Sequence, residues 1–320
     1  MTDFMIQRQS QIIPVSDEII SRLILKVTGH DMKEKQRIIE GNDSEVYDVK
    51  MVNDEHVILK VHRFGDVLYN QEVWAINESR KHGVPVPQVL FVGQEMINNE
   101  LRDTMILEKV IDERNLSKND IVRVLEQAGA ILKRIHSVKV HGYWRLHHDN
   151  QWDFDSWIDY VKSSIKDRTE DKEALFNVDF IEEDFKFIIK CHDLFMNTYE
   201  CHQPVLCHGD YTPEHWFVDE NLNITGIIDF GDMQGGPVTT DFAIFKMNEP
   251  QLDIISLLRG YHGIENSLID KDFSQQLDLH TLIILVGYLI HFVKQKNTQE
   301  INQTRDLLKE AIENLRQQYH

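Results

Sequence analysis

The spacing of apolar residues divides the chain into a first third that is mainly β and a remainder that is mainly helical. Short β-type runs separated by Gly, Asn and Asp predict antiparallel strands. Apolar residues at helical spacing predict one helix before these runs and one between them. The expected strands are 37–39, 46–52, 57–62, 88–92 and 104–109, and the expected helices are 16–27 and 66–82.

Beyond residue 109 most apolar positions repeat at helical spacing. A long helix is expected from Ser117 or Asn119 to about 137, because either residue can cap it. Further helices are expected from about 155, then at 183–199, 251–262, 276–295 and 300–317, with short β runs at 206–208, 216–218 and 224–229. The pattern predicts a bilobal α+β protein with a small antiparallel N-lobe, 1–110, and a larger helical C-lobe, 111–320. The hinge is expected near 108–113.

The net charge narrows the classes of partner. The chain has 34 Lys and Arg residues and 53 Asp and Glu residues, which gives a net charge of −19. Such a surface repels phosphate backbones and anionic lipid, so no nucleic-acid or membrane partner is expected. The apolar stretch 281–293 is too short to span a bilayer and predicts a buried helix. No signal peptide is visible and the three cysteines form no metal or disulfide pattern, so a cytoplasmic protein is expected.

Acidic and imidazole groups gather where two predicted strands end. His208, Asp210, His215, Asp229 and Asp232 fall within 25 residues. Side chains at adjacent strand ends converge, and crowded carboxylates repel unless a cation or proton lies between them. A single Asp in such a place is usually a turn former or a helix cap. The whole set instead favours metal binding or acid–base chemistry.

Three motifs resemble the aminoglycoside phosphotransferase family, small-molecule kinases with a protein-kinase-like fold. They are HGDYTPEH at 208–215, IIDFGD at 227–232 and DFA at 241–243, and the resemblance covers about 36–320. It implies that Asp210 is the catalytic carboxylate and that Asp229 and His215 hold Mg²⁺. The family pattern ends H-G-D-x-x-x-x-N, and His215 stands in place of that Asn. Imidazole suits Mg²⁺ less well than oxygen does, so the departure bears on metal preference.

The resemblance also assigns a nucleotide site for ATP or GTP in the N-lobe. It implies that Lys60 contacts the α- and β-phosphates and that Glu72 pairs with Lys60. The loop 41–44, with the Ser44 hydroxyl, would close over the phosphates, and Glu108 and Val110 lie in the segment facing the purine. The alternatives are a solvent-facing strand lysine, a helix-surface acid and a plain hairpin turn.

The acceptor is expected to be an aminoglycoside or another amine-bearing small molecule. Of the 19 excess negative charges, 14 fall in residues 111–320. Asp153, Asp155 and Asp159 lie where the family binds its acceptor, so they are the predicted acceptor-binding residues. The alternative for these acids is a solvated helix surface. Trp144, Trp152 and Trp157 are expected in the core in preference to the wall of an acceptor cleft.

Three other functions remain open from the sequence. A related kinase acting on a macrolide, a sugar, homoserine or an amino alcohol would use the same catalytic residues. A catalytically silent homologue would bind nucleotide without turnover. A metal-dependent phosphohydrolase would use His208, Asp210, His215 and Asp229, but such enzymes carry adjacent His-Asp pairs on helices, whereas here these residues follow predicted strands.

Overall fold

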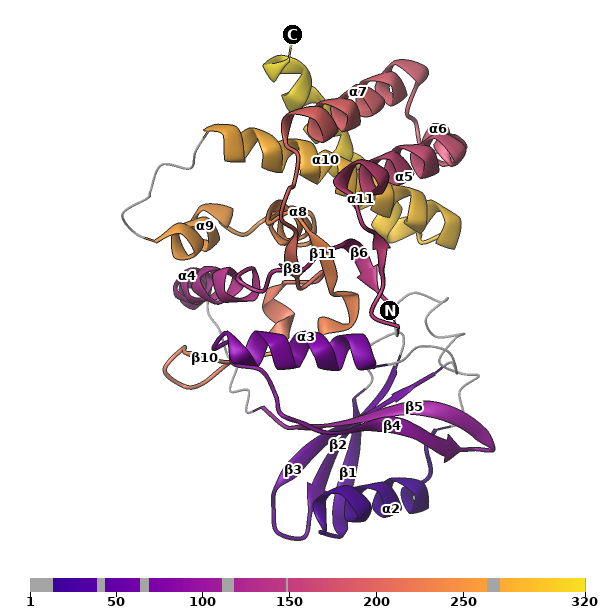
Figure 1. Ribbon diagram of the computed structural model, residues 1–320, viewed down its shortest axis with the longest axis vertical. Helices are drawn as coiled ribbons and strands as arrows, with labels where there is room; N and C mark the ends of the chain where they lie inside the picture. Colours follow the sequence, from indigo (N-terminus) through magenta and orange to yellow (C-terminus); the bar gives the residue numbers. More distant parts are fainter. Residues whose placement is uncertain are drawn as a thin grey trace.

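The computed structural model has a sheet-containing lobe at one end and a helical lobe at the other (Figure 1). It describes residues 14–38, 44–63, 69–110, 118–147, 149–263 and 271–319. The predicted bilobal α+β class is confirmed. The predicted hinge, 108–113, is described only at its start, because 111–117 lie outside the described residues.

An antiparallel five-stranded sheet forms the N-terminal lobe, with strand order β1-β2-β3-β5-β4. The strands are β1 Met32–Ile38, β2 Ser44–Met51, β3 His56–His62, β4 Val89–Ile97 and β5 Glu100–Glu108. β4 and β5 are longer than the pattern predicts. Asn98 and Asn99, at φ 52° and 66°, form a tight turn between them, and Asn tolerates this left-handed backbone.

Two helices cover opposite faces of this sheet. α2, Asp17–Thr28, lies where the sequence predicts a helix; Ser16 caps its start, and Gly29, at φ 76°, follows its end. It buries Ile20 and Ile24 against the sheet core. On the other face α3, Asn70–Lys81, contributes Ala75 and Ile76 to a core cluster that continues into the C-terminal lobe. The lobes therefore share apolar packing around α3.

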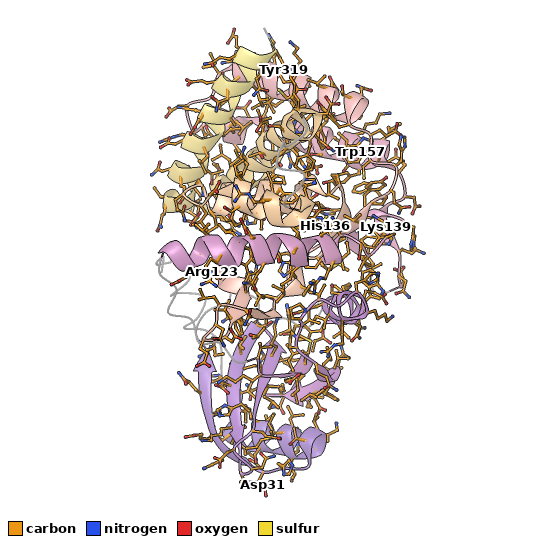
Figure 2. All side chains as sticks on the ribbon, turned by 90° about the vertical axis from the view of Figure 1, so that its left-hand side faces the viewer. Asp31, Arg123, His136, Lys139, Trp157 and Tyr319 are labelled. Atoms are coloured by element: carbon orange, nitrogen blue, oxygen red, sulfur yellow. The ribbon has the colours of Figure 1, made fainter. Side chains whose placement is uncertain are left out.

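Helices make up most of the C-terminal lobe. They are α4 Lys118–Ile135, α5 Trp157–Glu170, α6 Lys172–Phe176, α7 Glu182–Thr198, α8 Thr239–Asn248, α9 Ile254–His262, α10 Lys271–Gln295 and α11 Thr298–Gln318. α4 crosses the molecule between the sheet and the upper helices, with His136 just beyond its end (Figure 2). The sequence pattern missed α8, because nearly all of its residues are buried and it has no polar face to set a period.

Short strands lie between these helices in two separate sheets. β7 Trp152–Phe154, β6 Tyr143–Leu146, β11 Gln234–Gly236 and β8 Val205–Cys207 form one sheet in that order, and β9 Trp216–Val218 pairs with β10 Ile224–Ile227 in another. As expected, 208–210 follow a strand, β8, and 229–232 come just after another, β10, but the two strands belong to different sheets. Contacts between the loops bring the two segments together instead.

α10 contains the apolar stretch for which a buried helix is predicted. By length and composition alone this 25-residue helix could cross a membrane, but 56% of its apolar window is buried inside the protein. It packs against α7, α8 and α11. The predicted buried helix is confirmed.

Two fully buried histidines in this lobe predict a loss of stability in acid. Burial lowers the pKa of His192 to about 4 and that of His280 to about 3. In the unfolded chain both titrate near 6.5. Below that pH the unfolded state binds protons that the folded state does not, so stability is full above pH 6.5 and falls as the pH drops.

Each histidine should lower the free energy of unfolding by about 1.4 kcal/mol per pH unit between roughly pH 6 and 4.5. Urea unfolding at a series of pH values measures this slope. The double variant His192→Gln, His280→Gln should reduce this slope by the amount that corresponds to about two bound protons. An unchanged slope in that variant would contradict the assignment.

Candidate active site

The two loops that carry the acids meet at Gly209. This residue has φ 86°, and a Cβ placed on it would overlap the carbonyl oxygen of Asp232. Only glycine allows both the backbone conformation and the approach. His208 strengthens the contact, since its Nε2 lies 3.0 Å from the carbonyl oxygen of Ile228. The 208–210 loop and the 229–232 loop are therefore fixed against each other.

A buried carboxylate at the start of α8 holds the 208–210 loop. Asp241 Oδ1 accepts the Gly209 N–H at 2.8 Å, and its Oδ2 accepts the His208 N–H at 2.9 Å. His136 Nε2 lies 2.9 Å from the same Oδ2, and its Nδ1 lies 3.0 Å from the Tyr261 hydroxyl. Burial would raise the pKa of Asp241, but the hydrogen bond from His136 and the backbone donors outweigh it and lower that pKa. A carboxylate accepts only, so Nε2 of His136 carries the proton.

Asp241 stands in the DFA motif, whereas no sequence motif marks His136 as its partner. The occurrence of a DFA segment after the HGD segment was the one sequence signal that could have indicated a role for Asp241. The linking imidazole lies 105 residues before Asp241 and carries no motif of its own.

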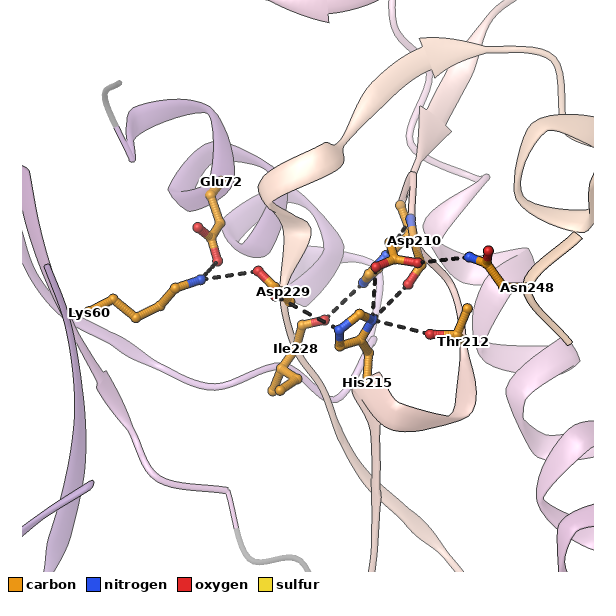
Figure 3. A network of polar contacts seen from close by, with 9 residues as sticks. Lys60, Glu72, Asp210, Thr212, His215, Ile228, Asp229 and Asn248 are labelled. Carbon is orange, nitrogen blue, oxygen red and sulfur yellow. Dashed lines mark hydrogen bonds and ion pairs between the residues drawn. The ribbon is translucent and has the colours of Figure 1, made fainter. Parts of the chain in front are cut away.

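Asp210 lies beside His215 and Asn248 (Figure 3). Burial raises the pKa of the Asp210 carboxyl to about 6; Asp232 and Glu214 act in the same direction, and His215 opposes them. Asn248 Nδ2 lies 3.4 Å from Asp210 Oδ1. The carboxylate is one-third accessible, so a bound molecule can reach it.

Asp229 connects this loop to the N-terminal lobe. Lys60 Nζ on β3 lies 3.1 Å from Asp229 Oδ1 and 2.8 Å from Glu72 Oε1 on α3 (Figure 3). The Lys60 ammonium lowers the pKa of Asp229 to about 2, against the opposing effect of burial. Asp229 adopts φ 66°, a strained backbone for a residue with a side chain. The structure thus brings together three residues that the sequence predicted as part of one site.

His215 and Asp229 present two possible ligand atoms to a metal ion. His215 Nδ1 lies 2.8 Å from the carbonyl oxygen of Asp210. A carbonyl accepts only, so Nδ1 carries the proton and Nε2 keeps its lone pair. That Nε2 lies 3.8 Å from Asp229 Oδ2, a separation that one divalent ion can bridge. The pair fits the divalent cation that the resemblance implies.

The remaining residues of the predicted nucleotide site lie at the lobe junction. The Ser44 hydroxyl lies 2.6 Å from the Tyr69 hydroxyl, while the rest of the predicted phosphate loop, 41–43, is outside the described residues. Glu108 ends β5, and its carboxylate accepts the Gln88 N–H at 3.3 Å. The Val110 side chain packs against Gly226 of β10.

The predicted acceptor-binding acids are all exposed, and two of them have local partners. Asp153 accepts the Arg145 N–H at 3.1 Å and pairs with His147 Nε2 at 2.7 Å. Asp159 accepts the Ser156 hydroxyl at 2.6 Å in the first turn of α5. No contact places these two carboxylates, or that of Asp155, against Asp210 within the described part of the chain. Their binding role stays a prediction.

The Asp241 contacts predict how the 208–210 loop responds to a near-isosteric change. Asp241→Asn keeps the size of the side chain but replaces one acceptor oxygen with a donor, leaving a buried N–H facing another N–H. The amides of His208 and Gly209 should exchange with solvent at least about tenfold faster, and the melting temperature should fall. Hydrogen-exchange mass spectrometry measures this. Exposed Asp193→Asn is the control, and equal protection in both variants would contradict the role.

Comparison with solved structures supports the fold. A ternary complex of a thermostable mutant of aminoglycoside phosphotransferase APH(4)-Ia with ADP and hygromycin B has TM-score 0.73 and 16% identity, covering 92% of this chain and 98% of that one. A putative fructosamine-3-kinase from Thermobifida fusca YX-ER1 has TM-score 0.65 and 16% identity, over 92% and 100%. The GDP complex of wild-type aminoglycoside 2'-phosphotransferase-IIIa has TM-score 0.61 and 15% identity, over 93% and 99%.

These identities establish the fold alone, and a search of curated proteins finds no match. Family membership comes from the sequence itself. The sequence model of the phosphotransferase enzyme family matches residues 35–267, which span both lobes and every residue of the Lys60–Asp229–His215–Asp210 site. With its kinase-like fold and these assembled residues, the chain belongs to the phosphotransferase enzyme family.

Proposed function

We propose that the protein transfers the γ-phosphate of ATP or GTP to a hydroxyl of a small molecule. One observation carries this proposal: Glu72, Lys60, Asp229, His215 and Asp210 form a continuous line of contacts from the nucleotide lobe to a carboxylate that an acceptor can reach. Phosphoryl transfer needs positioning and charge neutralisation above all, and this line supplies both. The proposal includes the division into a nucleotide-binding lobe, 1–110, and a catalytic and acceptor lobe, 111–320, in a cytoplasmic enzyme.

Each group has one task in the transfer. Lys60, held by Glu72, contacts the α- and β-phosphates, and Ser44 and the backbone near Glu108 and Val110 contact the rest of the nucleotide. Asp210 orients the acceptor hydroxyl and takes its proton. The hydroxyl oxygen bonds to the γ-phosphorus, the bond from that phosphorus to the bridging oxygen breaks, and its electrons leave with the nucleoside diphosphate. Mg²⁺ held by Asp229 and His215 would neutralise the phosphate charge.

The acceptor that we propose is amine-bearing, such as an aminoglycoside, which would give an antibiotic-resistance type of activity. The acidity of the C-lobe supports a cationic acceptor, with Asp153, Asp155 and Asp159 on its exposed surface. A related acceptor, such as a macrolide, a sugar, homoserine or an amino alcohol, would use the same catalytic residues.

Two alternatives lack phosphate transfer to an acceptor, the phosphohydrolase and the catalytically silent homologue, and the structure disfavours both. In a phosphohydrolase of the helical type, His208 and Asp210 would lie on a helix, but they follow strand β8. A catalytically silent homologue would need neither the Asp210 carboxylate nor the contact between Lys60 and Asp229. Release of ADP or GDP that depends on an added hydroxyl compound tests the proposal, and phosphate release without an acceptor would contradict it.

Asp210→Asn tests the proposed base. It should lower acceptor-dependent ADP or GDP release by about a thousandfold, because the amide cannot take the hydroxyl proton. Nucleotide binding, measured by calorimetry, should change less than about threefold. Asp193→Asn serves as the control. Acceptor-dependent turnover persisting in Asp210→Asn would exclude Asp210 as the base.

The His215 side chain is expected to shift the metal preference of the site, and this preference can be measured by metal binding without turnover. A nitrogen ligand favours Mn²⁺ over Mg²⁺, whereas an amide oxygen suits Mg²⁺. His215→Asn should therefore lower the ratio of the Mg²⁺ to the Mn²⁺ dissociation constant by about tenfold. Electron paramagnetic resonance of Mn²⁺, with Mg²⁺ as competitor and AMP-PNP present, measures both constants. An unchanged ratio would show that His215 Nε2 is not a ligand.

A further inference from the structure

The Arg168 side chain of α5 is a half-buried cation that no carboxylate contacts in the described part of the chain. Its guanidinium makes no hydrogen bond and no ion pair there, and its Nε–H is also sealed from solvent. Burial lowers the pKa of Arg168, and the nearby Tyr160, Asp167 and Asp171 do not offset this effect. A guanidinium stays charged in proteins, so this charge has lost hydration without gaining a partner, which is unfavourable.

The acids closest to Arg168 in the sequence do not pair with it. Asp171, which follows three residues later, binds Lys294 of α10 at 2.6 Å. Asp167 directly precedes Arg168, and consecutive residues of a helix point in different directions. The helix that carries the cation therefore supplies no anion for it.

Comparable arginines elsewhere in the protein do have a carboxylate partner. Arg102 Nη2 lies 3.2 Å from Glu45 Oε1, and Arg316 Nη2 lies 2.9 Å from Asp184 Oδ1. The chain has 53 acidic residues for 34 basic ones, so carboxylates are abundant. The fold nevertheless leaves Arg168 without one, whereas buried polar groups of native proteins normally have partners. The missing partner is therefore expected to come from outside the chain.

The guanidinium lies against the backbone of α10. A Cβ placed on Gly287 would overlap Arg168 Nη2, so glycine at this position leaves room for the cation. Tyr160 of α5 is close enough for Arg168 to act on it: burial raises the pKa of Tyr160 to about 12, and Arg168 opposes this rise. Among the described residues the Tyr160 hydroxyl has no hydrogen-bond partner either. The guanidinium N–H groups and the Tyr160 O–H are thus donors in want of an acceptor.

Two side chains connect this space to the proposed active site. The Tyr160 ring stacks on Trp144, with the centroids 6.2 Å apart, and Tyr288 directly follows Gly287 on α10. Trp144 and Tyr288 both line a pocket of about 40 Å³ beside the 208–210 loop. An anion bound between α5 and α10 would therefore join the two helices that support one wall of this pocket.

From these contacts we infer that the space between α5 and α10 at Arg168 is a binding site for an anionic group, a carboxylate or a phosphate. The planar guanidinium can give two parallel N–H bonds to either group, and the Tyr160 hydroxyl can give a third. The anion belongs either to a separate small molecule or to the acceptor itself, and the experiments below distinguish these sources. The site does not depend on the proposed phosphotransfer, which uses Lys60, Asp229 and Asp210.

Binding of inorganic phosphate and of acetate tests the site without any turnover. AMP-PNP and Mg²⁺ fill the nucleotide site so that Lys60 does not contribute, and chloride keeps the ionic strength constant. At least one of the two anions should raise the melting temperature of the full-length protein, because a ligand of the folded state stabilises it. Calorimetric titration measures its dissociation constant. Absence of binding by both anions would overturn the inference.

The decisive variant is Arg168→Met, which keeps the length of the side chain and removes the charge. Its affinity for the anion should fall by about tenfold or more, because charge-assisted hydrogen bonds are lost. Without anion its melting temperature should be no lower than that of the native protein, since the charge that it removes has no partner. Equal anion affinity in the native protein and in Arg168→Met would overturn the inference. A clearly lower melting temperature without anion would also contradict it, because the guanidinium would then stabilise the fold by itself.

Two further variants separate a built site from general attraction to positive charge. Gly287→Ala should displace the end of the flexible Arg168 side chain and keep its charge, while alanine suits the interior of α10. Its anion affinity should fall several-fold. Lys166→Met removes a positive charge from the exposed face of α5 and is the matched control. An equal loss of affinity in Lys166→Met and Arg168→Met would contradict a specific site.

Kinetics identify the source of the anion. If it is part of the acceptor, phosphate should compete with an acidic hydroxyl compound such as gluconate, and Arg168→Met should raise the KM for gluconate by about tenfold and leave that for glucose unchanged. If it is a separate molecule, phosphate should change the KM or kcat for an uncharged acceptor without competing with it. Either result supports the site. Anion binding through Arg168 without any phosphate transfer would overturn the proposed function and leave the anion site intact.

Discussion

The ion pair between Lys60 and Asp229 is the interaction on which the arrangement of the site depends. It joins residues 169 positions apart, one on the N-terminal sheet and one on the C-terminal lobe, at 3.1 Å. Burial alone would lower the pKa of Lys60, but Glu72 and Asp229 outweigh it and hold that pKa above its ordinary value. The ammonium therefore stays charged between two carboxylates. Lys60 and Glu72 are both largely buried, so removing either of these two side chains leaves an uncompensated charge, which is strongly unfavourable.

This pair also moves apart the pKa values of the two carboxylates of the proposed site, Asp229 and Asp210. Next to Lys60, the pKa of Asp229 falls to about 2, whereas burial and neighbouring acids raise that of Asp210 to about 6. Two acids in one cleft with pKa values pushed apart can take different roles. The low pKa of Asp229 suits a carboxylate that binds a cation, and the raised pKa of Asp210 suits a carboxylate that accepts a proton. His215 lies between them, with Nδ1 on the Asp210 carbonyl and Nε2 toward Asp229.

Much of this arrangement could be predicted from local patterns, and the misses have physical causes. The HGD and DFGD segments stand in short motifs, and the family resemblance assigns Lys60 to the same site, so their convergence could be anticipated. The way in which the short strands of the C-terminal lobe pair into sheets could not be predicted, because strands of three or four residues, such as β8 and β11, show almost no alternation of apolar and polar residues. Trp144 was expected in the core because Trp is usually buried, and its exposure follows from a left-handed backbone that its sequence does not signal. His136 supports Asp241 across 105 residues, a contact that only tertiary structure creates.

Calorimetric titration of Lys60→Met with AMP-PNP and with AMP tests the central claim most directly, because only AMP-PNP carries the β- and γ-phosphates. If Lys60 links Asp229 to the phosphates, the native protein should bind AMP-PNP more tightly than AMP. In Lys60→Met most of that difference should disappear while AMP binding stays nearly constant. Equal preference for AMP-PNP in the native protein and in Lys60→Met would contradict the account.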